Sequence, residues 1–250
     1  NAMQMLDMRE LRISYEADLP ARSGLGTSSS FAVGMLNAFH CMKGTYASKE
    51  RLAKEAITLE RELCGEAGGW QDQIAAAYGG LNRIDFGGDG FSVRPIVISP
   101  ERKRELESNL MLFFTGFTRF SSDMQRKNHV ADKTAQLKEM LELVDVAEGV
   151  LTDKSKDLAE FGRLLDATWR LKRGTGGQVS TGSIDALYER GMNAGALGGK
   201  LLVAGGGVFL VFYVEPDARD SVRKAMGDLL HIPFEFEDGG TSVVYYDPED

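Results

Sequence analysis

The stretch Pro20-Ala-Arg-Ser-Gly-Leu-Gly-Thr-Ser-Ser-Ser30 decides how the chain is interpreted, because it joins a predicted strand to a predicted helix. Residues 9–17 before it alternate apolar and polar side chains, which indicates a strand. After it, apolar side chains recur at helical spacing from Phe31 to Met42. A strand, a glycine-rich turn and a helix form a common phosphate-binding unit, because free backbone N–H groups and the helix dipole point at the anion.

The side chains of this turn suit phosphate but do not prove it. Gly24 and Gly26 let the backbone turn tightly, and Thr27, Ser28 and Ser29 can cap the helix or offer hydroxyls to phosphate or Mg2+. A serine-rich cap after a glycine turn explains the spacing equally well. A P-loop is excluded because no Lys-Ser/Thr pair follows the second glycine, and a dinucleotide-binding loop because Ser29 stands where it needs a third glycine.

A carboxylate interrupts the apolar face of the next predicted helix, which runs from Ser48 to Cys64. At about 100° per residue, Glu60 falls in the middle of the apolar arc of residues 52–64. A buried carboxylate is costly unless it is paired or ligates a metal. The pattern therefore predicts either an ion pair with an arginine from elsewhere or a ligand for Mg2+.

A second carboxylate follows in the turn Gly68-Gly-Trp-Gln-Asp-Gln73. The glycines permit close approach of the backbone to a ligand. Asp72 can accept a hydrogen bond or a proton from a substrate hydroxyl. On local sequence alone, a cap for the helix of residues 73–78 explains Asp72 better than a catalytic role does.

The rest of the pattern predicts an α+β protein. We expect a strand pair at 81–86 and 91–98, a buried strand at 109–115, and charged helices over 121–172 with a break near Asp153. The last part predicts strands at 201–204 and 208–214 around a glycine turn, a helix at 217–230, and strands at 233–237 and 242–247. The charged run after Ser99 and Pro100 marks a domain boundary near residues 100–108.

In this order, the motifs resemble those of the GHMP kinases, a superfamily of small-molecule kinases. Residues 20–29 are similar to its motif Pro-x-x-x-Gly-Leu-Gly-Ser-Ser, with Thr27 in place of the first serine. The turn at 68–73 and the run Ala75-Ala-Ala-Tyr-Gly-Gly80 are similar to those of bacterial D-glycero-D-manno-heptose phosphate kinases. The resemblance implies that ATP is bound by Ser23, Gly24, Leu25, Gly26, Thr27, Ser28 and Ser29.

The same resemblance implies roles for residues outside this loop. Asp72 would be the catalytic residue, and Ser28 and Glu60 would hold Mg2+. The segment from Lys200 to residue 210 is similar to the third superfamily motif, although valines stand at 203 and 208 where the family has glycine. The implied substrate contacts are Gly69, Gln71, Gly205, Gly206 and Gly207.

The resemblance also implies a fold. We expect a ribosomal-S5-like N-terminal domain over residues 3–105 and a ferredoxin-like C-terminal domain over residues 106–250. The N-terminal domain is expected to be truncated, because the Arg-x-Pro-Gly motif with which these kinases begin is not found. A truncated sheet would expose an edge, and dimerisation of two copies through that edge is one expected response.

Composition excludes several other classes of protein. The 250 residues carry a net charge of −8, which argues against non-specific binding to nucleic acid. No apolar run approaches the length of a membrane span, no signal-peptide pattern is present, and the two cysteines do not form a disulfide framework. A cytoplasmic protein is therefore expected.

Three hypotheses remain. The first is an ATP-dependent kinase acting on a sugar or sugar phosphate, most similar to the heptose phosphate kinases. The second is another GHMP kinase, of the fucose, galactose or mevalonate type. The third is a truncated remnant that binds nucleotide without catalysis.

Overall fold

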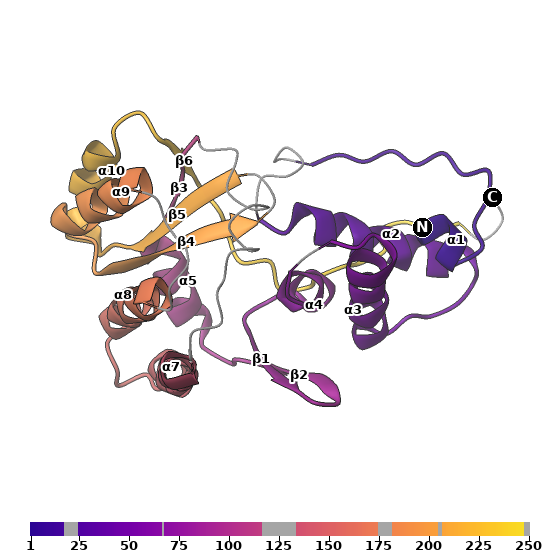
Figure 1. Ribbon diagram of the computed structural model, residues 1–250, viewed down its shortest axis with the longest axis horizontal. Coiled ribbons are helices and arrows are strands. Elements are labelled where there is room, and N and C mark those ends of the chain that lie inside the picture. The colour runs from indigo at the N-terminus through magenta and orange to yellow at the C-terminus, as the bar shows by residue number, and fades with distance from the viewer. Residues whose placement is uncertain (18–24, 67, 117–133, 175–181, 205–206, 248–250) are drawn as a thin grey trace. The chain divides into compact units, whose positions relative to one another are not determined.

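The computed structural model describes residues 1–17, 25–66, 68–116, 134–174, 182–204 and 207–247 (Figure 1). The chain divides into two compact units. The first unit comprises Asn1–Pro95 together with Phe236–Asp250, and the second comprises Ile96–Glu235. Within the described residues, no helix is both long and apolar enough to cross a membrane.

The first unit is built around three helices that pack on one another. They are α2 (Thr27–Met42), α3 (Lys49–Ile57) and α4 (Gln71–Tyr78). Their shared core includes the fully buried side chains of Leu36, Leu52 and Ile74. The short helix α1 (Ala2–Met5) precedes them, and the antiparallel hairpin of β1 (Asn82–Gly87) and β2 (Gly90–Pro95) follows, as the sequence predicts.

The predicted helix from Ser48 to Cys64 changes its winding partway along. Ser48 caps α3 as expected, since its hydroxyl accepts a hydrogen bond from the backbone N–H of Arg51. Beyond α3, the turn Thr58–Leu63 is a π-helix, in which the N–H of Cys64 bonds to the carbonyl of Leu59 at 2.9 Å. Such π-turns are frequently found at functional sites.

The start of α2 differs from the prediction. The N-cap is Gly26 in the left-handed conformation (φ 72°), and no side chain of the described residues caps the helix, so the alternative of a hydroxyl cap from Thr27, Ser28 or Ser29 is wrong. The physical reason is that the hydroxyls of Ser28 and Ser29 donate to a carboxylate on another helix instead.

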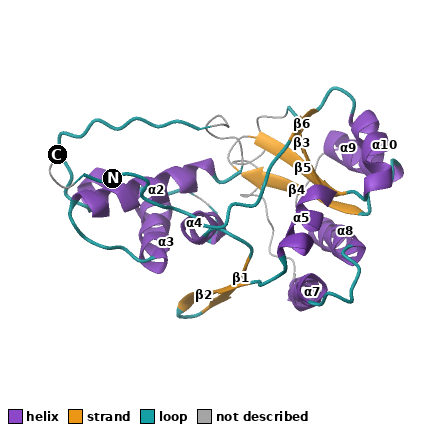
Figure 2. Cartoon of the chain, turned by 180° about the vertical axis from the view of Figure 1, so that it is seen from behind, coloured by secondary structure: helices purple, strands orange, loops and turns teal. Residues whose placement is uncertain are grey.

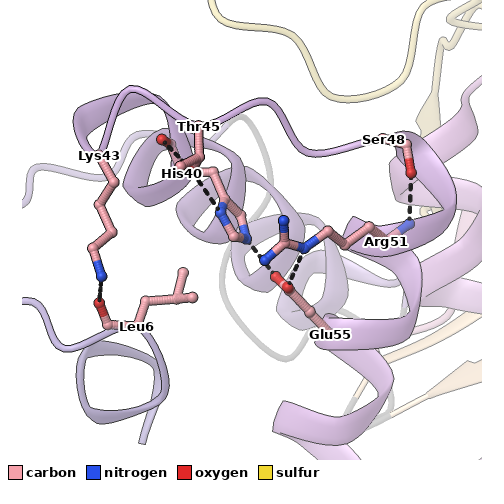
Figure 3. Close-up of polar contacts among 7 residues, drawn as sticks. All are labelled: Leu6, His40, Lys43, Thr45, Ser48, Arg51 and Glu55. Atoms are coloured by element: carbon pink, nitrogen blue, oxygen red, sulfur yellow. Dashed lines mark hydrogen bonds and ion pairs between the residues drawn. The ribbon is translucent and has the colours of Figure 1, made fainter.

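A polar cluster joins the C-terminal end of α2 to α3 (Figure 3). The buried ring of His40 lies between Glu55, whose Oε2 is 2.6 Å from Nε2, and Thr45, whose Oγ1 is 3.2 Å from Nδ1. Arg51 donates to the other oxygen of Glu55 at 2.7 Å. This cluster accounts for His40 as a satisfied structural residue.

Three predicted strands are absent from the described structure. Residues 9–17 form no strand, and Ile13 and Tyr15 are about half exposed. Residues 233–237 and 242–247 form none either, and the strand of this region is β6 (Leu230–Ile232). A segment with alternating side chains forms a strand only when a neighbouring strand completes the hydrogen-bond ladder. No described strand pairs with these segments.

The segment 236–247 returns to the first unit and is fixed to α4. The N–H of Gly80 bonds to the carbonyl of Glu237 at 2.6 Å, and the N–H of Thr241 to the carbonyl of Ala76 at 3.1 Å. Gly240 lies so close to this helix end that an added Cβ would be 2.6 Å from the carbonyl oxygen of Ala77.

The second unit is a four-stranded antiparallel sheet with helices on both faces (Figure 2). Its strand order is β4-β5-β3-β6, and its connections run strand, helix, strand, strand, helix, strand, which confirms the expected ferredoxin-like arrangement. The strands are β3 (Leu110–Phe114), β4 (Gly198–Ala204), β5 (Gly207–Tyr213) and β6. The helices are α5 (Pro100–Asn109), α7 (Thr134–Thr152), α8 (Ala159–Gly174), α9 (Gly182–Asn193) and α10 (Arg219–Met226).

Glycines bring the helices of this unit close to its sheet. Neighbouring residues of β5 face opposite sides, so Phe212 meets Gly191 of α9 while Tyr213 meets Gly162 of α8. An added Cβ on Gly198 of β4 would be 1.8 Å from the carbonyl oxygen of Gly162. The backbones of α8 and β4 are therefore in direct contact.

Candidate active site

The carboxylate of Glu60 lies at the centre of a hydrogen-bond network in the first unit. Glu60 is 4% exposed and belongs to the π-helical turn. The hydroxyl of Ser28 donates to its Oε1 at 2.5 Å, and the hydroxyl of Ser29 to its Oε2 at 2.7 Å. The amide of Gln73 also donates to Oε2. One carboxylate thus joins the first turns of α2 and α4 to the π-helical turn that follows α3.

This network shows how the predicted conflict on the apolar helix face is resolved. The described partners of Glu60 are two hydroxyls and an amide rather than an arginine. Three donors suit an ionised carboxylate, because hydrogen bonds to the charged form compensate for lost hydration. The structure brings the predicted pair Ser28 and Glu60 into contact, and their binding of a metal stays a prediction.

Asp72 lies next to the start of α2. It stands in the first turn of α4 and is half-buried. An added Cβ on Gly26 would be 3.6 Å from the Cβ of Asp72, so the side chain adjoins the turn that leads into α2. The structure therefore brings the predicted catalytic residue beside the described end of the predicted phosphate loop.

The groups around Asp72 shift its pKa in opposite directions. Burial raises the pKa of Asp72 above its ordinary value. The hydrogen bond with Gln71 and the positive charge of Arg61 act to lower the pKa, whereas the nearby charge of Glu60 acts to raise it. A carboxyl in this balance accepts a proton at a higher pH than a solvated aspartate does.

The N-terminus of α2 has the properties of an anion site. The helical bonds begin with the N–H of Ser30, which bonds to the carbonyl of Gly26 at 2.9 Å, and among the described residues no side chain caps the preceding N–H groups. Leu25, Gly26 and Thr27 are half-buried, and Ser28 is exposed. Ser23 and Gly24 lie outside the described residues.

The predicted substrate residues are only partly placed. Gly69 and Gln71 are exposed on the turn before and at the start of α4. Gly207 opens β5 in the second unit, and Gly205 and Gly206 lie outside the described residues. The structure brings together residues from the loop, the π-helical turn and α4, and their roles remain predictions.

Two features of the site escaped the sequence-based interpretation. Gln73 is fully buried and completes the network on Glu60, although its neighbours gave it no distinguishing pattern. Its helical spacing is the one signal that could have selected it, since Gln73 lies one turn before the buried Ala77 and next to the buried Ile74. The second feature is Arg61, whose positive charge acts to lower the pKa of Asp72.

Comparison with known protein families gives two matches on this chain. Residues 1–80 match the GHMP kinases N terminal domain, and residues 147–231 match the GHMP kinases C terminal domain. Together the two ranges cover more than half of the chain.

Individual relatives agree with these matches. The chain is 30% identical over 219 residues to D-glycero-alpha-D-manno-heptose 7-phosphate kinase of Campylobacter jejuni, covering 84% of this chain and 63% of the relative. It is 31% identical over 217 residues to the bifunctional fucokinase/GDP-fucose pyrophosphorylase of Arabidopsis thaliana, covering 82% of this chain and 20% of that protein. A crystal structure of a D-glycero-D-manno-heptose 1-phosphate kinase from Bacteroides thetaiotaomicron matches with a TM-score of 0.68 and 29% identity, covering 92% of this chain and 66% of that one. The chain thus spans less than two thirds of the length of these relatives.

Proposed function

The chain belongs to the GHMP kinase superfamily, and on that premise we propose that it is an ATP-dependent kinase that phosphorylates a hydroxyl of a heptose phosphate. The observation that carries the proposal is the buried carboxylate of Glu60, bonded to Ser28 at the start of α2, with Asp72 beside the same turn. Phosphoryl transfer needs positioned charges and little covalent chemistry from the protein, which suits this arrangement.

We assign the nucleotide to the N-terminus of α2 and the loop before it. Uncapped N–H groups and the positive end of the helix dipole favour phosphate oxygens. The left-handed Gly26 lets the backbone turn into the helix without a side chain in the way of the phosphates. We propose that residues 23–29 bind ATP at this end of α2.

The residues around Glu60 fit a magnesium ion. The network already brings one carboxylate and one hydroxyl within 2.5 Å of each other, and both are hard oxygen ligands. Mg2+ binds few protein oxygens when nucleotide phosphates and water complete its shell, so Glu60 and Ser28 would be sufficient. When bound, the ion would neutralise charge on the phosphates.

Asp72 is proposed to orient the acceptor. Its carboxylate accepts a hydrogen bond from the sugar hydroxyl and receives that proton as the oxygen bonds to the γ-phosphorus. The bond from the γ-phosphorus to the β–γ bridging oxygen breaks at the same time, and ADP leaves. We propose that Gly69 and Gln71, which lie in the first unit with Asp72, contact the sugar.

A heptose phosphate is the preferred acceptor because two of the relatives named above are heptose phosphate kinases. A second candidate is a fucose-type sugar, which the similarity to the Arabidopsis fucokinase favours. A panel of heptose 7-phosphate, heptose 1-phosphate, fucose, galactose and mevalonate, with coupled detection of ADP, separates them. ADP release with a heptose phosphate supports the proposal, and no ADP release with any acceptor refutes it.

We further propose that the reaction takes place in the cytoplasm, where ATP is available, and that copies of the chain associate. The exposed apolar side chains of Ile13, Tyr15, Val244 and Tyr245 offer a surface for such contact. Light scattering after size exclusion tests this, and a monomer at micromolar concentration would refute the association.

A further inference from the structure

Arg61 occupies an unusual position in the first unit. It follows Glu60 in the π-helical turn and is half-buried. Its guanidinium lies against the backbone of Gly68, where an added Cβ would be 2.9 Å from Nη1 and 3.0 Å from Nη2. Gly68 has φ 150°, which L side chains rarely adopt. A glycine at this point is what leaves room for the guanidinium.

The described residues supply few hydrogen-bond acceptors for the guanidinium of Arg61. Nη1 donates a long hydrogen bond of 3.3 Å to the carbonyl of Glu66. Nε is buried and has no hydrogen-bond partner in the described part of the chain. Among the described residues, no carboxylate forms an ion pair with Arg61. A buried donor without a partner costs free energy, so an acceptor supplied from outside the described residues would bind favourably at Nε.

The charge of Arg61 acts on the proposed site. Arg61 directly follows Glu60, whose carboxylate contacts Ser28 at the start of α2, and the charge of Arg61 acts against the burial that raises the pKa of Asp72. Asp72 in turn adjoins Gly26 at the start of α2. Arg61 is therefore a planar cation, without an ion-pair partner among the described residues, near the residues to which we assign the nucleotide and the acceptor.

Resting on the proposed function, we propose that Arg61 is a further catalytic residue, whose guanidinium binds the non-bridging oxygens of the phosphoryl group during its transfer. A planar fork of N–H donors matches phosphate oxygens in a way that the point charge of lysine does not. The γ-phosphorus exchanges its bond to the leaving oxygen of ADP for a bond to the sugar oxygen, and the hydroxyl proton passes to Asp72. Arg61 keeps its own protons and stabilises the charge that spreads over the equatorial oxygens.

A structural role is the alternative, in which Arg61 only holds the turn of residues 65–70 in place. The variants Arg61→Met and Arg61→Lys separate the two roles by kcat, KM and thermal stability. We expect Arg61→Met to lower kcat by about 10²–10³-fold, the loss typical of removing one transition-state donor. We expect Tm to move by no more than about 4 °C and the Kd for Mg-ATP to change little. Arg61→Lys should recover part of kcat, because it restores the charge without the fork.

Chemical rescue gives a readout that a structural role would not move. Arg61→Gly should regain turnover when guanidinium chloride is added at tens of millimolar, with sodium chloride at equal ionic strength giving no recovery. Arg104→Met is the matched control, because Arg104 is exposed on α5 and pairs only with Glu101 among the described residues. We expect it to keep the kcat of the unmodified chain.

The outcomes separate this inference from the proposed function. An unmodified chain that releases no ADP with any acceptor overturns both. If the unmodified chain is active and Arg61→Met keeps its kcat within about threefold, only the role of Arg61 is overturned. Loss of kcat in Arg61→Gly that guanidinium does not restore, with a lowered Tm, also overturns it in favour of the structural role.

Discussion

Replacing Glu60 by glutamine tests the proposed magnesium site without emptying the space that the side chain fills. The amide has the same shape, and it keeps one acceptor oxygen where the carboxylate has two. If that oxygen takes the place of Oε2, it still accepts from Ser29 and Gln73. The new NH2 group then faces Ser28, whose hydroxyl can rotate to accept instead of donating.

The stability change should therefore be small. Hydrogen bonds to a charged acceptor contribute about 1.5–3 kcal/mol and neutral ones about 0.5–1.5 kcal/mol, so weakening the three bonds costs a few kcal/mol at most. Removal of a buried charge offsets part of this cost, because the carboxylate no longer has to be desolvated. We expect the free energy of unfolding in urea to fall by about 1–2 kcal/mol.

The effect on the nucleotide should be larger. Loss of a carboxylate ligand should weaken Mg2+ at least as much as the loss of a supporting residue, which costs about 10–100-fold. Isothermal titration should show Mg-ATP binding weakened by that factor in Glu60→Gln, with ATP in EDTA unaffected. Glu62→Gln is the matched control, because Glu62 is exposed in the same π-helical turn. Equal Mg-ATP affinity in Glu60→Gln and the unmodified chain would refute the metal role of Glu60.

Three further predictions follow from the same structure. Asp72→Asn should lower kcat by about 10²–10⁴-fold and keep nucleotide affinity, and an unchanged kcat would contradict the catalytic role. Because burial raises the pKa of Asp72, its charged form is disfavoured in the folded state at neutral pH, so the variant should also have a higher Tm at pH 7 and lose that gain as the pH falls toward 4. Gly198→Ala should lower the free energy of unfolding by about 3 kcal/mol or more, because its Cβ would collide with the carbonyl of Gly162. A urea unfolding curve of the variant equal to that of the unmodified chain would contradict the direct contact of α8 with β4. Glu55→Ala should cost about 1–3 kcal/mol, because buried His40 loses its acceptor, and a Tm equal to that of the unmodified chain would show that the cluster contributes nothing.

Local patterns predicted the helices and the buried carboxylate well, because each depends on neighbours in sequence. Helical spacing placed Glu60 on an apolar face, and the structure buries it there. The partners on its two oxygens could not be derived in full, because Ser29 and Gln73 reach it only through the packing of α2 and α4 against α3. The π-helical turn was missed because a single such turn continues directly from an α-helix, and the apolar spacing of the segment does not distinguish the two.

Strand predictions were less successful where a partner strand was needed. The buried strand at 109–115 was confirmed as β3, which is hydrogen-bonded on both sides by β5 and β6. The alternating segments 9–17 and 242–247 look as suitable by pattern, yet neither is a strand among the described residues. The alternation of side chains shows only that a segment is compatible with a sheet. Whether the segment becomes a strand depends on a partner strand from another part of the chain.

The attachment of residues 236–247 to α4 makes the second unit an insertion within the first. The helix end at Tyr78 and Gly79 is completed by residues that are synthesised only after the whole second unit has been synthesised. The first unit therefore cannot reach its final form during synthesis until the inserted unit is complete, whereas the sheet and helices of residues 96–235 can form earlier. The order in which the two units mature is thus opposite to the order in which they begin along the chain.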